Sequence, residues 1–236
     1  MPDVVNRSAL EAELAKRFSK LSARHRKELL KLLGNPPNYS NVPNSFWKKV
    51  ITQLNGSFIP VLTEIYMQQA GTLLQGLPIG VDWGLINEGA IAWAKLHGGE
   101  LIKGVTDTTQ KIIRDAVTAF FEQPMTRADL EKMISPAFGT MRAEMIAITE
   151  VTNAASAAEI AIAEELADEG ILMEAVWKTQ YDALVCKICE PLNNMKASGY
   201  TGKRTPYWDH PVSGKRMSKP AAHPRCRCHM SLELPK

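Results

Sequence analysis

The chain has 236 residues, of which 45% are hydrophobic, 28 are Lys or Arg and 25 are Asp or Glu. This composition excludes wholesale disorder and is enough to build one large domain or two small ones. No apolar run reaches the ~18 residues that a membrane-spanning helix needs, and the N-terminus lacks the apolar core of a secretory signal, so we expect a protein that folds in a cytosol without membrane contact.

The net charge of +3 conceals an uneven distribution. Residues 1–175 carry 17 basic and 21 acidic side chains, whereas residues 176–236 carry 11 basic and 4 acidic ones. All four cysteines and three of the five histidines also lie in the second stretch. Charge and sulfur content therefore change at about the same place, which predicts two regions of different character.

The first two-thirds of the chain have the three-four periodicity of amphipathic helices. Apolar residues recur in this way from Leu10 to Leu32, after a Ser8–Glu11 pair with capping-box spacing, and Gly34 ends the pattern. Further helices are predicted at about residues 44–54, from Pro60 to about residue 74, from just after Asp82, at about 107–122 and from Thr126.

The clearest periodicity covers residues 139–169, which we expect to form one long helix that ends at Gly170. Arg142 and Glu150 lie near one face of it and are expected to be structural ion-pair partners, because spacing alone does not make them catalytic. His97 precedes two glycines and is expected at a helix end.

After Gly170 the period changes to two, which predicts a strand over residues 171–179. Residues 229–234 alternate again and can pair antiparallel with it, whereas residues 193–222 have the composition of a loop. The predicted fold class is mainly α with a small α+β C-terminal region, in which a long helix precedes a two- or three-stranded antiparallel sheet and a cysteine-pinned loop.

The chemistry of the chain concentrates in two short motifs, Cys186-Lys-Ile-Cys189 and His223-Pro-Arg-Cys226-Arg-Cys228. Two cysteines that are two residues apart in a turn can point both sulfurs at one tetrahedral ion. Cys226 and Cys228 face the same side of an extended segment and can converge in the same way. The pattern predicts a structural zinc site whose ligands come from Cys186, Cys189, His223, Cys226 and Cys228.

The ligand set stays open at this stage, because His223 can replace one thiolate of the second pair. His210 and His229 are weaker candidates, and free thiols or a disulfide are the alternatives to a metal. A closed four-ligand site leaves no open position for a substrate, so the pattern disfavours metal-dependent hydrolysis, and we expect no enzyme.

Several motifs follow one another in a specific order. They are Arg142 to Glu150, Trp177-Lys-Thr179, Val185-Cys-Lys-Ile-Cys189 and His223-Pro-Arg-Cys-Arg-Cys228. In this order the sequence resembles the phage Mu F-protein-like head morphogenesis family, a family of minor capsid proteins, over roughly residues 137–234. One departure is Asn194-Met195, where family members often have Gly.

The resemblance implies a minor head protein of a tailed bacteriophage or prophage, which acts in procapsid assembly and in DNA packaging or delivery. Its expected partners are the portal protein and other head or scaffold proteins, and its expected location is the virion head, after assembly in the host cytoplasm. The implied domains are a helical region, residues 1–136, of unassigned role and a head morphogenesis region, residues 137–236. The five Cys and His positions are those suspected of binding metal in the family.

The basic C-terminal region offers a second interpretation, a zinc-containing nucleic-acid-binding module, since phosphate contacts need only Lys and Arg. The candidate DNA-contacting residues lie on the long loop, where a merely solubilising role is equally compatible with them: Lys203, Arg204, Lys215, Arg216 and Lys219. A hydrolase that uses His210, His223 or His229 is a third interpretation, but the chain has no HExxH, GxSxG or P-loop motif.

Overall fold

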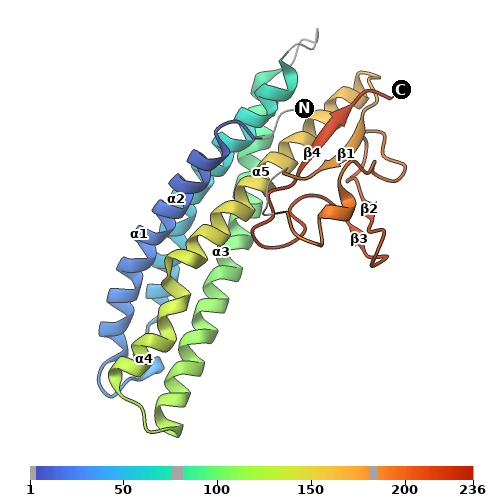
Figure 1. The fold of residues 1–236 in the computed structure, drawn as a ribbon. Coiled ribbons are helices and arrows are strands. Elements are labelled where there is room, and N and C mark those ends of the chain that lie inside the picture. Colours follow the sequence, from blue (N-terminus) through green and yellow to red (C-terminus); the bar gives the residue numbers. More distant parts are fainter. Residues whose placement is uncertain (1–3, 76–81, 181–184, 236) are drawn as a thin grey trace.

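The computed structural model describes residues 4–75, 82–180 and 185–235. Its long helices lie side by side in an elongated bundle, and the C-terminal residues form a small lobe beside the end of α5 (Figure 1). The helices are α1 (Arg7–Leu33), α2 (Asn44–Leu74), α3 (Trp83–Glu122), α4 (Arg127–Ile134) and α5 (Thr140–Asp168). The predicted fold class, mainly α with a small α+β part, is confirmed.

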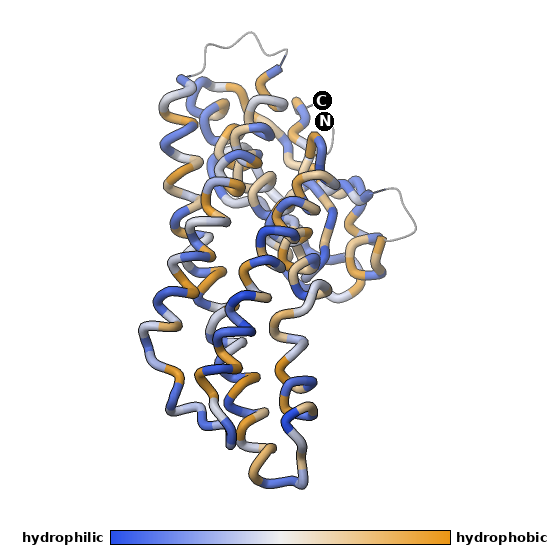
Figure 2. Tube along the Cα trace, turned by 90° about the vertical axis from the view of Figure 1, so that its left-hand side faces the viewer, coloured by the Kyte–Doolittle hydropathy of each residue, from blue (hydrophilic) through white to orange (hydrophobic). Residues whose placement is uncertain are grey.

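The bundle is held together by one apolar stripe on each long helix, visible as recurring hydrophobic positions along the tube in Figure 2. On α1 the buried residues include Leu14, Phe18, Leu29 and Leu33, which recur at helical spacing. In this bundle α2 packs on α3 and α5, and α1 packs on α5. α5 therefore lies at the centre of the contacts and serves as the surface on which the lobe is built.

Two expected helix boundaries are wrong. The structure has one helix through Pro60 and one through Gly98, where the sequence predicted breaks. Phe58 and Leu62, on either side of Pro60, are fully buried, so core packing outweighs the backbone hydrogen bond that proline removes. At Gly98 a Cβ atom would lie 3.3 Å from Ile59, so this glycine permits the close approach of α3 to α2. His97 is accordingly in mid-helix, where it pairs with Glu150 and stacks on Trp93.

Two local expectations about charged residues also fail. The Ser8–Glu11 capping box does not form, because α1 begins at Arg7 after a left-handed Asn6 without a side-chain cap, and Glu11 is buried. Arg142, expected in an ion pair, donates instead to the Thr109 hydroxyl and to two backbone carbonyls. The expected ion pairing does hold for Glu150, whose partner is His97. The expected cap at Thr126 does form, as a full capping box at the start of α4.

By length and composition alone, the stretch Arg127–Asp168 is apolar enough to cross a membrane. However, 61% of its most apolar window is buried inside the molecule. This burial is typical of a helix in a protein core, which is the place that α5 occupies.

The lobe contains the expected antiparallel pair, β1 (Glu174–Lys178) and β4 (His229–Glu233), with Trp177 opposite Met230. An isolated bridge joins Val176 to Lys196 at the other edge of β1. The loop between β1 and β4 includes a short helix, η3 (Glu190–Leu192), and a hairpin of β2 (Trp208–Asp209) and β3 (Arg216–Met217). Trp177 and Trp208 are fully buried and meet edge to face with ring centroids 5.2 Å apart.

α5 contributes to both hydrophobic clusters of the described residues. Val151 belongs to the cluster that fills the helical bundle, whereas Ala158 and Ile162 belong to the cluster beneath the lobe. Its small residues let the lobe backbone come close, most tightly at Gly202. The predicted division between residues 1–136 and 137–236 stays a prediction.

Gly202 provides a test of this close packing. It has φ of +96°, and an added Cβ would lie 2.7 Å from the Ala163 carbonyl oxygen and 2.8 Å from the Ala167 Cβ. Gly202→Ala is expected to lower the free energy of unfolding by about 2–4 kcal/mol through backbone strain and overpacking. Gly199 also has positive φ but open space, so the control Gly199→Ala should cost only about 1–2 kcal/mol. Urea unfolding measures both, and equal losses would contradict the packing argument.

Candidate metal centre

The Cys186–Cys189 motif forms a tight turn, which we call the knuckle. The backbone N–H of Cys189 donates to the Cys186 carbonyl over 3.0 Å, and the N–H of Glu190 donates to the same carbonyl over 2.9 Å. This turn brings the two sulfurs to one side and leaves Ile188 half exposed. The expected bite of a Cys-x-x-Cys ligand pair is therefore present.

The second motif turns at Pro224 and Arg225. The N–H of Cys226 donates to the His223 carbonyl over 3.1 Å, and Arg225 has φ of 63°. Proline followed by a left-handed residue is typical of a type II turn, although glycine is the usual residue at the second position. The N–H of Arg225 donates to the Thr149 hydroxyl over 3.0 Å, which fixes this strained turn on α5.

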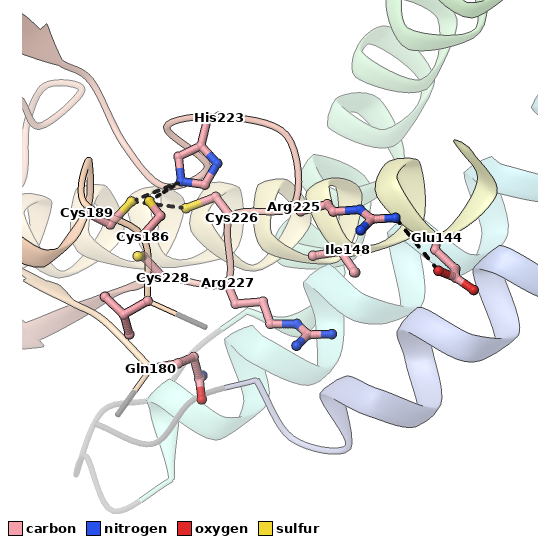
Figure 3. Close-up of a pocket in the computed structure, with 11 residues that line it drawn as sticks. Glu144, Ile148, Gln180, Cys186, Cys189, His223, Arg225, Cys226, Arg227 and Cys228 are labelled. Atoms are coloured by element: carbon pink, nitrogen blue, oxygen red, sulfur yellow. Dashed lines mark hydrogen bonds and ion pairs between the residues drawn. The ribbon is translucent and has the colours of Figure 1, made fainter. Parts of the chain in front are cut away.

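The two motifs meet, as Figure 3 shows. His223 Nε2 lies 3.0 Å from Cys186 Sγ and 3.3 Å from Cys189 Sγ, and Cys189 Sγ lies 3.8 Å from Cys226 Sγ. Ligands around one tetrahedral zinc ion lie about 3.5–3.8 Å apart, because Zn–S and Zn–N bonds are about 2.3 and 2.0 Å long. The donors are therefore at a spacing that one ion can occupy after small adjustments.

The donors form two overlapping groups within metal-binding distance. The first is Cys186, Cys189 and His223, and the second is Cys189, Cys226 and Cys228, with all donor atoms of each group within 4.8 Å of one another. Cys189 belongs to both groups. The structure thus brings together all five of the ligand candidates that the sequence suggested.

The imidazole of His223 has the tautomer that a metal ligand needs. Its Nδ1 lies 2.8 Å from the Pro224 carbonyl oxygen, which can only accept, so Nδ1 carries the proton. The lone pair of the neutral ring is then on Nε2, which faces the sulfurs. A carbonyl partner of this kind is the usual support of a metal-bound histidine.

The buried thiols share protons through hydrogen bonds, and a bound cation would take the place of those protons. The hydrogen bond between Cys189 and Cys226 raises the pKa of the Cys189 thiol and lowers the pKa of Cys226. Cys189 and Cys226 are each 1% exposed, so a thiolate here lacks solvent. A divalent ion replaces the shared protons when it binds to deprotonated thiols.

Charged and polar residues of the bundle secure the second motif. The Thr152 hydroxyl donates to the Cys226 carbonyl over 2.7 Å and accepts a hydrogen bond from Arg7 over 2.9 Å. Arg227 pairs with the buried Glu11 over 3.0 Å. The start of α1 and the middle of α5 therefore hold the backbone that carries two of the donors.

These supporting residues were not predicted, although the sequence contains a signal for them in the form of polar residues on buried helix faces. Arg7 and Glu11 occupy the same stripe as Leu14 and Phe18, so two charged residues fall where the periodicity requires burial. Thr152 likewise lies on the buried stripe of α5. Buried polar residues need partners, and here the partner is the cysteine loop.

The cluster lies at the wall of a cavity of about 360 Å³ between α5 and the loop. Apart from the five donors, the cavity is lined by Val185 and by five residues whose relation to the cluster is seen in Figure 3: Glu144, Ile148, Gln180, Arg225 and Arg227. Arg225 is 3.8 Å from Glu144, a distance at which a surface ion pair contributes little. Both guanidinium groups point away from the sulfurs (Figure 3), Arg225 toward Glu144 and Arg227 toward Glu11.

The weaker histidine candidates lie outside both donor groups of the described residues. His210 is buried, and both of its ring nitrogens contact backbone groups of the loop, which leaves neither free for a metal. His229 is the first residue of β4 and is also buried.

The five predicted DNA-contacting residues have different surroundings. Arg204 and Lys215 are exposed, and Lys203 is 3.1 Å from Asp168. Arg216 is 3.5 Å from Asp209 and lies over the ring of Tyr207. Burial lowers the pKa of Lys219, an effect that the Glu150 carboxylate opposes. Four of them are therefore exposed on the loop, whereas Lys219 is partly buried.

Comparison with known proteins gives no match, because no family model fits the chain and no curated protein or solved structure is significantly similar to it. Function is therefore inferred from the residues and geometry of this chain.

A cysteine-by-cysteine substitution series tests the site. The shortest contacts link Cys186, Cys189, His223 and Cys226, which we take as the ligand set. Loss of a residue that only supports a ligand commonly lowers metal affinity by about 10–100-fold. Cys189→Ser removes a ligand and is therefore expected to lower it by more than ~100-fold. Cys228→Ser is the matched control and should weaken binding less than about 10-fold. Competition with a chromophoric chelator under reducing conditions measures the affinities. Equal effects of the two variants would contradict this ligand set.

Proposed function

We propose that the chain is a minor head protein of a tailed bacteriophage or prophage, which acts in procapsid assembly and in DNA packaging or delivery. The observation that carries this proposal is the convergence of the ordered motifs. The long helix, the Trp177 strand, the cysteine knuckle and the His-Pro-Arg-Cys-Arg-Cys segment all contribute to one compact lobe. A motif series with one shared structural purpose supports the family resemblance better than any single motif does.

We further propose that the bound ion is zinc and that its role is structural. Zinc prefers sulfur and imidazole donors in a tetrahedral arrangement, which matches a Cys₃His set made of Cys186, Cys189, His223 and Cys226. Four protein donors fill that shell and leave no position for a substrate, so the proposed role is support of the lobe and not catalysis. Portal, head and scaffold proteins are the proposed partners, and the virion head is the proposed location.

The shape of the molecule suits a role in assembly. The bundle is elongated, and it presents large exposed apolar side chains far apart in the sequence, such as Leu96 on α3 and Met141 on α5. The acidic, helical region before the lobe is the proposed protein-contacting part.

Assembly in a reconstituted system tests this proposal. The chain would be expressed with and without a cognate portal and scaffold, and proheads would be separated by sedimentation. The chain is expected to co-sediment with proheads only when the portal is present, and Cys189→Ser should reduce its incorporation because the lobe loses its metal. Absence from both proheads and mature particles would overturn the proposal.

The exposed cationic side chains of the loop favour a second candidate, a zinc-containing nucleic-acid-binding module. If Arg204 and Lys215 contact phosphates, affinity for generic duplex DNA falls steeply with salt. Removing both charges should lower the steepness of that dependence by about two phosphate contacts. Fluorescence anisotropy of the full chain at several salt concentrations measures it, and the absence of salt-sensitive binding would dismiss this candidate.

A further inference from the structure

His210 lies in the hairpin of the long loop, 22 residues beyond the knuckle residue that it contacts. Its Nε2 is 2.8 Å from the Ile188 carbonyl oxygen. Its Nδ1 is 3.1 Å from the backbone N–H groups of both Val212 and Ser213. His210 is 7% exposed as a residue, so these three contacts are largely shielded from water.

The contacts fix one tautomer of this ring. Two backbone N–H groups point at Nδ1, so Nδ1 must accept and carries no proton. The proton is therefore on Nε2, which donates to the Ile188 carbonyl. A neutral imidazole in this form joins two backbone donors of the hairpin to one backbone acceptor of the knuckle.

The carbonyl that His210 binds belongs to the peptide group just before Cys189. The N–H of that same peptide group donates to the Cys186 carbonyl. One end of the peptide plane is thus held by the knuckle itself and the other end by His210. Cys189 follows this plane directly, and it is the one donor that belongs to both metal-binding groups.

The hairpin that carries His210 is itself well anchored. Trp208 is fully buried, its Nε1–H donates to the Met195 carbonyl over 2.8 Å, and its ring packs on Trp177. The N–H of His210 donates to the Lys215 carbonyl, and its own carbonyl accepts from Gly214. The imidazole therefore reaches the knuckle from a support that does not depend on the knuckle.

We propose that His210 is a positioning residue of the metal centre, which orients Cys189 by holding the Ile188–Cys189 peptide group. This inference rests on the proposed metal function of the cluster. It assigns to His210 neither ligation nor catalysis, and it makes the geometry of the metal centre depend on the hairpin. Supporting residues of this kind commonly change metal affinity by about 10–100-fold when they are removed.

Three substitutions test the contacts of the two ring nitrogens of His210 separately. His210→Gln places an amide N–H near the position of Nε2 and keeps the contact with Ile188. His210→Asn places a carbonyl oxygen near Nδ1 and keeps only the contacts with Val212 and Ser213. His210→Ala keeps neither. Val212→Ala is the control, because the 80% exposed side chain changes while the backbone N–H remains.

Zinc affinity, measured by chelator competition on the full reduced chain, should fall about 10–100-fold in His210→Ala and in His210→Asn. His210→Gln and Val212→Ala should stay within a few-fold of the wild type, and the cobalt-substituted wild type and His210→Gln should share one visible spectrum. If His210→Asn kept the wild-type zinc affinity and His210→Gln did not, the inference would be overturned. The contacts of His210 within the hairpin, and not its contact with Ile188, would then be the ones that matter. Wild-type affinity in His210→Ala would overturn it as well.

A second measurement separates failure of this inference from failure of the metal proposal. In metal-free, reduced protein, Cys189 is 1% exposed and should react slowly with iodoacetamide. His210→Ala is expected to accelerate that alkylation by at least ~10-fold, whereas Val212→Ala should not, because only the first variant frees the peptide group before Cys189. A wild type that binds no zinc would refute the metal proposal, and the alkylation rates would still decide whether His210 holds Cys189 in place. An unchanged alkylation rate in His210→Ala would refute the role of His210.

Discussion

The meeting of two donor motifs separated by 33 residues is the constraint on which the C-terminal lobe depends. The intervening segment has few regular elements, and its hairpin has strands of only two residues. A chain of this kind loses much conformational entropy when it becomes ordered, and short strands return little of it. Closing the loop at the cysteine cluster, which shares a buried core with Trp177 and Trp208, supplies the missing restraint.

The same cluster connects the lobe to the bundle. Thr152 reaches the backbone of Cys226, Thr149 reaches that of Arg225, and Glu11 pairs with Arg227, so three contacts from two helices converge on one short segment. Buried charged and hydroxyl groups of this kind are costly unless every partner stays in place. Order in the cysteine segment and the position of the first turns of α1 are therefore coupled, although residues 11 and 227 lie near opposite ends of the chain.

Much of this arrangement could be predicted from the sequence, because it depends on local periodicity or residue chemistry. The α5 helix, the antiparallel pair predicted at 171–179 and 229–234 and found at 174–178 and 229–233, and the approach of the two cysteine motifs are of this kind. The continuous helices through Pro60 and Gly98 could not be predicted, since tertiary packing decides them. The roles of Glu11 and His210 depend on partners more than 20 residues away, which no local pattern encodes.

Zinc K-edge X-ray absorption of the reduced protein, purified without chelators, tests the central claim most directly. The account predicts about one zinc per chain with a first shell of three sulfurs at about 2.3 Å and one imidazole nitrogen at about 2.0 Å. A sample without metal, or a shell of oxygen and nitrogen alone, would contradict it. The convergence of the two motifs would then need another cause.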